Sequence, residues 1–290
     1  MKYLDKKQSL DGSTKYLWEL NDRKTVESIY FLFNNEKYTC ISSQIGCNVK
    51  CVFCETGKQN NLRNLTSNEI LTQVESTIHD LKIDEPLYQV AFAGMGEPLL
   101  NFENVIEGSK LIHENKLSKT ISLSTSGIVP KMYDLVNSPI TKLFISLHAS
   151  NNETRNHLVP INTKYPIEQL LKAAHFFFEK SKTKVTATYI LFDGINDTDK
   201  DLTQLAMLLD PDVYTIQLSV WNSISDVNLR PSKRMDYFES SLRNIGFDVF
   251  VLNSKGKDIQ GGCGQLRSRN TQLIQKEAEA LSQNFSNQNY

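Results

Sequence analysis

The sequence predicts an α/β protein, a partial (β/α)6 TIM-like barrel that follows a small N-terminal β meander. From about residue 38 onward, strand-like and helix-like segments alternate, which is typical of a parallel sheet with crossover helices. About six such units precede a last strand. This number suits a partial barrel, in which functional residues follow the C-terminal ends of the strands. A doubly wound open sheet is the structural alternative.

The elements follow from apolar periodicity and turn residues. Meander strands are expected at residues 15–20, 26–33 and 38–43, separated by turns at residues 21–22 and 34–35. Further strands are expected at residues 88–93, 120–124, 142–147, 184–191, 213–220 and 247–252. Helices are expected at residues 66–81, 102–115, 166–180, 199–209 and 232–244. The first of these helices opens with Thr66-x-x-Glu69, the pattern of a capping box.

Composition excludes several classes of protein. The chain has 290 residues, 40% of them hydrophobic, so it can bury a core. Its net charge of −1 argues against gripping long nucleic acid through overall charge. We see neither a secretory signal nor an apolar run long enough to span a membrane. Five cysteines, three of them clustered, favour a metal site in a reducing compartment, so we expect a cytoplasmic protein.

The clustered cysteines have the spacing C-x3-C-x2-C, at Cys47, Cys51 and Cys54. Three thiolates on one loop can hold three irons of a 4Fe–4S cluster and leave the fourth open to a small chelating ligand. The alternative is structural zinc, which usually takes four ligands. The sequence offers no second cysteine pair and no suitable histidine pair. The spacing therefore favours iron–sulfur, and it resembles that of the radical S-adenosylmethionine (SAM) superfamily.

Polar groups also follow the other predicted strands. The segment Gly94-Met95-Gly96-Glu97-Pro98 follows the second barrel strand, where glycines let backbone approach a ligand closely. Further polar side chains end other strands: Ser124 ends the third, the stretch Ser146-Leu147-His148 ends the fourth, and Asn222 follows the sixth. Taken singly, each is more often a loop cap or a satisfied core group. Together they converge on one barrel mouth, which favours a binding site.

Two cysteines remain. Cys40 lies in a predicted strand and fits a small buried apolar residue about as well as a functional thiol. Cys263 stands among three glycines in a polar segment, which is typical of a loop that presents a nucleophile.

With these residues the chain resembles the RlmN/Cfr family, radical SAM methylases of adenosine in 23S ribosomal RNA. The matching stretches are residues 39–47, 56–59, 94–105, 123–127, 145–149, 158–162 and 263–266. The resemblance implies an N-terminal extension (residues 1–37), a radical SAM barrel with a C-terminal cysteine loop (38–267) and a helical tail (268–290). The family usually has a further N-terminal helical domain that helps to grip RNA, whereas this chain begins near the meander.

The resemblance implies a methyl-cysteine relay. Cys263 takes a methyl group from one SAM. A second SAM, bound at the cluster, is cleaved to a 5′-deoxyadenosyl radical that activates this methyl group for addition to C2 or C8 of adenine. Cys40 releases the product by forming a disulfide, and Glu27 accepts the ring proton. The residues expected to bind SAM are Gly96, Glu97, Ser124, Ser146, Leu147, His148 and Asn222.

The sequence also allows other interpretations of the substrate, the partners and single residues. The acceptor is expected to be 23S rRNA, with tRNA as an additional substrate, and the alternatives are a smaller RNA, a nucleotide or another heteroaromatic. A flavodoxin-like protein is the expected electron donor. A non-catalytic, metal-stabilised RNA-binding protein is disfavoured because binding needs neither Cys40 nor Cys263. The alternative to a catalytic role for Glu27 is a strand residue that faces solvent. The basic residues near Arg234 and Arg267 fit an RNA-backbone track or a solvated surface.

Overall fold

The structure is a computed structural model of the chain. It describes residues 1–59, 63–224, 227–252, 256–259, 262, 264–265 and 267–268. Cys263 and residues 269–290 therefore lie outside the described residues.

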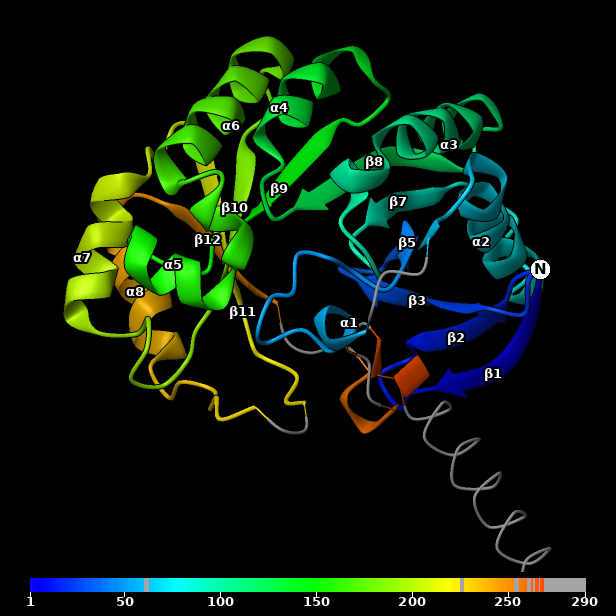
Figure 1. Ribbon diagram of the computed structural model, residues 1–290, viewed down its shortest axis with the longest axis horizontal. Coiled ribbons are helices and arrows are strands. Elements are labelled where there is room, and N and C mark those ends of the chain that lie inside the picture. The colour runs from blue at the N-terminus through cyan, green and yellow to red at the C-terminus, as the bar shows by residue number, and fades with distance from the viewer. Residues whose placement is uncertain are drawn as a thin grey trace, which may run out of the picture.

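The core of the fold is a curved parallel sheet (Figure 1). Seven strands pair in parallel in chain order, which matches six βα units and a last strand. They are β4 (Glu36–Ile41), β7 (Leu87–Phe92), β8 (Ser118–Thr125), β9 (Lys142–Ser146), β10 (Val185–Ile190), β11 (Tyr214–Ser219) and β12 (Asp248–Leu252). Neighbours in sequence are neighbours in the sheet, so the partial barrel is confirmed and the doubly wound alternative is wrong.

An antiparallel meander extends this sheet at its β4 edge. It consists of β1 (Lys2–Gln8), β2 (Thr14–Glu19) and β3 (Thr25–Phe33), and β3 pairs with β4. The turn between β3 and β4 places Asn34 and Asn35 at φ of 49° and 61°, as a tight hairpin requires. Sequence reasoning missed β1, a charged and largely exposed edge strand. The meander and the barrel strands thus form one continuous sheet from β1 to β12, and the domain division at residue 37 stays a prediction.

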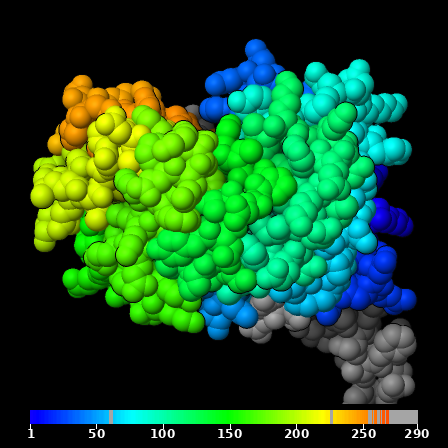
Figure 2. All heavy atoms as spheres, turned by 90° about the horizontal axis from the view of Figure 1, so that it is seen from above, coloured from blue at the N-terminus to red at the C-terminus, as the bar shows by residue number. Residues whose placement is uncertain are grey.

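Helices cover the outer side of the sheet, as Figure 1 shows. Figure 2 shows the molecular surface seen from above. The longer helices are α2 (Ser67–Asp80), α3 (Phe102–Glu114), α6 (Ile167–Ser181), α7 (Asp199–Leu208) and α8 (Met235–Ile245). Each lies within three residues of its predicted bounds, and the capping box between Thr66 and Glu69 is present. No helix among the described residues has both the length and the hydropathy needed to cross a membrane.

Shorter elements complete the chain. The α-helical turns are α1 (Glu55–Lys58), α4 (Val129–Met132) and α5 (Asn152–Leu158), and the small second sheet pairs β5 (Gln44–Ile45) with β6 (Arg63–Asn64). The 3₁₀ turns are η1 (Pro98–Asn101), η2 (Tyr133–Asn137), η3 (Pro160–Thr163) and η4 (Lys257–Ile259).

The two faces of the barrel strands have different roles. Alternate residues such as Val90, Leu123 and Ile145 join the core beneath the helices. The residues between them, such as Ala91, Ser124 and Phe144, line a cavity of about 660 Å³. The inward face thus carries many small and polar side chains, which leaves room for a ligand.

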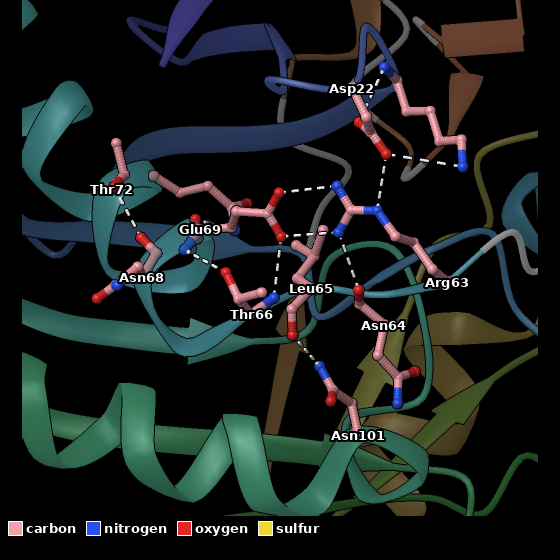
Figure 3. A network of polar contacts seen from close by, with 11 residues as sticks. Asp22, Arg63, Asn64, Leu65, Thr66, Asn68, Glu69, Thr72 and Asn101 are labelled. Atoms are coloured by element: carbon pink, nitrogen blue, oxygen red, sulfur yellow. Dashed lines mark hydrogen bonds and ion pairs between the residues drawn. The ribbon is translucent and has the colours of Figure 1, made fainter.

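An ionic network fixes the chain beyond the cysteine loop (Figure 3). The Arg63 guanidinium makes two bonds of 2.8 Å to the carboxylate of Glu69 and one of 2.8 Å to Asp22. Asn101 donates to the carbonyl oxygens of Leu65 and Ser43, both at 2.8 Å. These contacts tie β6 to the meander and to the turn that precedes α3.

Candidate active site

The three clustered cysteines lie on one loop that follows β5 and leads into α1. Lys50 has a φ of 59°, and the Cys54 N–H donates to the Cys51 carbonyl at 3.1 Å, so the loop bends sharply between the thiols. Gly57 packs against this bend, because a Cβ there would lie 2.9 Å from the Cys51 carbonyl oxygen. The loop thus holds three thiols close together without secondary structure of its own.

The thiol groups lie in a protected environment. Burial raises the pKa of Cys47 to about 12 and that of Cys51 well above its usual value. Backbone N–H groups of Val49 and Lys50 donate toward Cys47, and Ser126 hydrogen-bonds the thiol of Cys51, so each sulfur has groups that favour its thiolate. A buried thiolate also needs a positive partner, which the irons of a bound cluster would supply.

This donor set fits a 4Fe–4S cluster. In the described part of the chain, no three histidine, cysteine or acidic side chains converge closely enough to hold a single metal ion. A cube of four irons binds each thiolate at a different iron, so its ligands need not meet at one point. The arrangement therefore differs from the compact tetrahedron of structural zinc.

The glycine-rich turn after β7 packs tightly beside the loop. A Cβ at Gly94 would lie 2.6 Å from the Ile41 carbonyl oxygen, and one at Gly96 would lie 2.5 Å from Cβ of Gln44. Gly96 also has a φ of 98°, which glycine adopts without strain. Only glycine suits these positions.

Glu97 follows this turn and is 2% exposed. Its carboxylate accepts bonds from the Thr125 hydroxyl (2.6 Å) and from the N–H groups of Ser126 (2.7 Å) and Leu99 (3.2 Å). Burial nevertheless raises its pKa. The carboxylate joins the ends of β7 and β8, and its remaining lone pairs are suited to a cationic ligand.

At the end of β9, a buried arginine organises the backbone. Arg155 donates to the carbonyl oxygens of Ser126 (2.8 Å), Ser146 (2.9 Å) and Leu147 (3.1 Å), and to the side chain of Asn162 (2.7 Å). Burial lowers its pKa to about 10, so it stays protonated at neutral pH. It places a positive charge beneath the ends of β8 and β9.

His148 occupies a left-handed backbone conformation, with a φ of 54°, and is 3% exposed. Its Nδ1 accepts the Ile190 N–H at 3.1 Å, and its ring stands edge-on to Phe53, with centroids 4.9 Å apart. Burial, assisted by Arg155, lowers its pKa to about 3. His148 is therefore a neutral imidazole with its proton on Nε2.

The inner cavity brings together four of the predicted site residues. Its lining includes Cys40, Cys54, Ser124 and Asn222, and also Gly262. Cys40 is buried in β4, at the end nearest the cysteine loop. The cavity thus brings the strand thiol of Cys40, the last cysteine of the loop and a chain neighbour of Cys263 to one space.

Glu27 is buried on β3, 3% exposed, rather than solvent-facing. Its carboxylate contacts Lys15 and backbone N–H groups of the segment that contains residue 263. Among the basic residues weighed as an RNA track, Arg267 is half-buried and bonds Gln59 at 2.5 Å. Arg234 is half-buried and pairs with Asp199.

Sequence reasoning missed Arg155 and Lys15. Arg155 stands in a polar stretch with no apolar pattern. Lys15 opens a strand in which residues of both faces are buried, so alternation carries no signal. Neither position could be recognised before the fold was known.

Comparisons with known proteins agree with this site. The model of the Radical SAM superfamily matches residues 41–206. A protein described as a probable dual-specificity RNA methyltransferase RlmN, from Dictyoglomus turgidum, is 41% identical over 267 residues, which cover 89% of this chain and 77% of the relative. A protein of the same description from Thermotoga maritima is 40% identical over 275 residues, covering 92% and 79%.

A solved structure extends the comparison to three dimensions. The crystal structure of a radical SAM methyltransferase from Sphaerobacter thermophilus superposes with a TM-score of 0.86 at 34% identity, covering 91% of this chain and 80% of the other. The superfamily uses a 4Fe–4S cluster and SAM, and the cysteine loop and glycine-rich turn fit both cofactors. The chain therefore belongs to the RlmN/Cfr family of radical SAM methyltransferases.

Proposed function

We propose that the protein methylates an sp2 carbon, C2 or C8, of adenosine in RNA through a methyl-cysteine relay. The substrate named for the relatives is RNA, and 23S rRNA is the first choice, with tRNA as an additional substrate. The observation that carries this proposal is the single cavity that joins Cys40, Cys54 and Gly262, the neighbour of Cys263. Two thiols beside a cluster are what the relay needs.

Cys47, Cys51 and Cys54 would hold the cluster, and Gly96, Glu97, Ser124, Ser146, Leu147, His148 and Asn222 would hold SAM. When bound, these cofactors supply the methyl group and a 5′-deoxyadenosyl radical. A radical route is needed because adenine C2 and C8 and the SAM methyl group are all electrophilic. Glu97 offers a carboxylate to the ammonium group of SAM, and the neutral His148 offers an Nε2–H donor.

The protein's thiols handle the one-carbon unit. The Cys263 sulfur carries the methyl group as a thioether. Loss of one hydrogen atom to the 5′-deoxyadenosyl radical would let the methyl carbon bond to the adenine ring, and the adduct would then give up the ring proton and one electron, which the cluster would accept. Attack by the Cys40 thiolate on Sγ of Cys263 breaks the bond between that sulfur and the bridging carbon, which takes up a proton to become the methyl group of the released base, and leaves a disulfide. Glu27 is the proposed acceptor of the ring proton, and its carboxylate must first leave Gly264 and Arg267.

The proposed reaction also bears on the electron donor, the cellular location and the alternative acceptor. The cluster needs a low-potential reductant, for which a flavodoxin-like protein is our choice. A ribosomal RNA substrate implies that the protein acts in the cytoplasm. The alternative acceptor is a smaller RNA, a nucleotide or another heteroaromatic, because the near-neutral charge of the chain weakens the case for a large RNA.

The test is methylation by anaerobically purified protein, with 23S rRNA fragments, tRNA and free adenosine nucleotides as substrates. Mass spectrometry of the digested products should find methyladenosine in an RNA substrate. Cys263→Ala should lose this product entirely while it keeps the visible absorbance of the cluster and the cleavage of SAM. Methylation at the wild-type rate in this variant would contradict the relay, and methylation of nucleotides alone would favour the alternative acceptor.

A further inference from the structure

A buried ion pair lies between the meander strands β2 and β3. Lys15 Nζ and Glu27 Oε2 are 2.8 Å apart, and their side chains are 1% and 3% exposed. The register pairs Lys15 with Ile29 and Leu17 with Glu27, so the two charges are diagonal neighbours on one face of β2 and β3. Burying two charges costs desolvation energy that their mutual attraction often fails to repay. Stability alone is therefore a weak reason for the pair.

The pair instead holds a distant segment. Glu27 Oε2 accepts the Gly264 N–H at 2.9 Å, and Oε1 accepts the Arg267 N–H at 2.6 Å. Lys15 Nζ donates to the Gly262 carbonyl oxygen at 2.6 Å. These partners are more than 230 residues away in sequence. The side chains of Lys15 on β2 and Glu27 on β3 thus hydrogen-bond the backbone on both sides of position 263.

The opposite side of this segment rests on α1, the helix that follows the cysteine loop. Gly264 has a φ of 81°, and a Cβ there would lie 2.6 Å from Thr56 Oγ1 in α1. Gln59 donates to the Gly264 carbonyl oxygen at 3.1 Å and to the Ser268 hydroxyl at 2.8 Å. The segment therefore lies between the meander and the helix that directly follows Cys54.

We propose that Lys15 and Glu27 are positioning residues that dock the backbone at Gly262, Gly264 and Arg267 against α1, beside the cysteine loop. The inference rests on the proposed function, because docking matters for catalysis only if residue 263 carries the methyl group. Gly262 and Gly264 are the bonded neighbours of residue 263, so holding both limits where its thiol can lie. Glu27 thereby has a role before any proton transfer, because its carboxylate accepts the hydrogen bonds that fix the segment.

Docking is tested by backbone amide exchange, which needs no turnover. In the wild-type holoprotein without RNA, the amides of Gly264 and Arg267 should be protected. In the double variant Lys15→Met/Glu27→Gln, which removes both charges while keeping the size of each side chain, both amides should exchange at least tenfold faster. The control Lys37→Met/Glu85→Gln removes an exposed pair whose atoms are 2.7 Å apart, and it should leave both amides unchanged.

Two results would overturn docking. The first is wild-type exchange at the unprotected rate, which is decisive even if the double variant fails to fold. The second is unchanged exchange in a folded double variant. Absence of methylation by the wild-type protein would instead contradict the proposed function and leave the exchange result standing.

Positioning is tested by kinetics of the single variants. Lys15→Met retains the Glu27 carboxylate, so a role limited to proton acceptance predicts normal turnover. Positioning predicts that Lys15→Met and Glu27→Gln both lower kcat for methylation, by about 100-fold for a displacement near 1 Å, with the KM for SAM unchanged. Full turnover of Lys15→Met would contradict a positioning role for this pair.

Discussion

The indole N–H of Trp221 donates to the carbonyl oxygen of Phe53 at 2.9 Å. Trp221 follows β11, whereas Phe53 immediately precedes the last cysteine of the loop. The bond therefore ties the cysteine loop to a strand on the far side of the barrel.

Trp221→Phe should weaken cluster retention. The change leaves the Phe53 carbonyl without this donor, at a cost of about 1 kcal/mol, and it loosens the loop. We expect faster loss of visible absorbance when a chelator is added. Trp18→Phe is the matched control, because it removes a buried indole bond of 2.7 Å to Ser28 in the meander. Equal chelator sensitivity of the two variants would show that the Phe53 bond does not protect the cluster.

Gly96→Ala should abolish SAM binding and lower the melting temperature. The new Cβ would lie 2.5 Å from Cβ of Gln44, and the residue would also keep a φ of 98°. Gly194→Ala separates the two effects, since Gly194 has a φ of 69° but nothing within 4 Å of an added Cβ. We expect the control to lose only about 1 kcal/mol through backbone strain and to bind SAM normally in calorimetry. Normal SAM affinity of Gly96→Ala would be inconsistent with a closely packed turn.

His148 should make the fold sensitive to mild acid. Its folded pKa of about 3 lies below the ordinary value of 6.5, so the unfolded chain binds more protons between these values. Stability is therefore lost as the pH falls below 6.5, by about 2 kcal/mol at pH 5. Asparagine also tolerates the left-handed backbone, so His148→Asn is the comparison.

The measurement is denaturant unfolding of the wild type and His148→Asn at pH 7.5 and pH 5. Comparing the two proteins at each pH cancels effects shared by the rest of the chain. The stability advantage of the wild type should shrink by about 2 kcal/mol at the lower pH. A constant difference would mean that His148 is not a buried neutral imidazole.

Much of the fold could be predicted because its signals are local. The alternation of apolar residues predicted every barrel strand, and helical periodicity predicted the longer helices. Thr66 with Glu69 marked the start of α2. The exposed strand β1 was not predicted, because its charged residues suit the edge of a sheet but show no apolar alternation.

The site was only partly predictable. The cysteine spacing and the glycine-rich turn are contiguous, so the chain itself displays them. Arg155 and the pair of Lys15 with Glu27 depend on partners brought together by folding. A buried charge is recognisable only when its acceptors are known, and these lie on other strands or at the far end of the chain.

The central claim is that Cys40 and Cys263 act as successive thiols on one substrate. The most direct measurement is mass spectrometry of Cys40→Ala protein purified from cells and digested with protease and nuclease. Because the proposed relay assigns product release to Cys40, we predict an adenosine joined through a one-carbon bridge to the peptide that contains residue 263. Continued methylation by Cys40→Ala with no such adduct would contradict the claim.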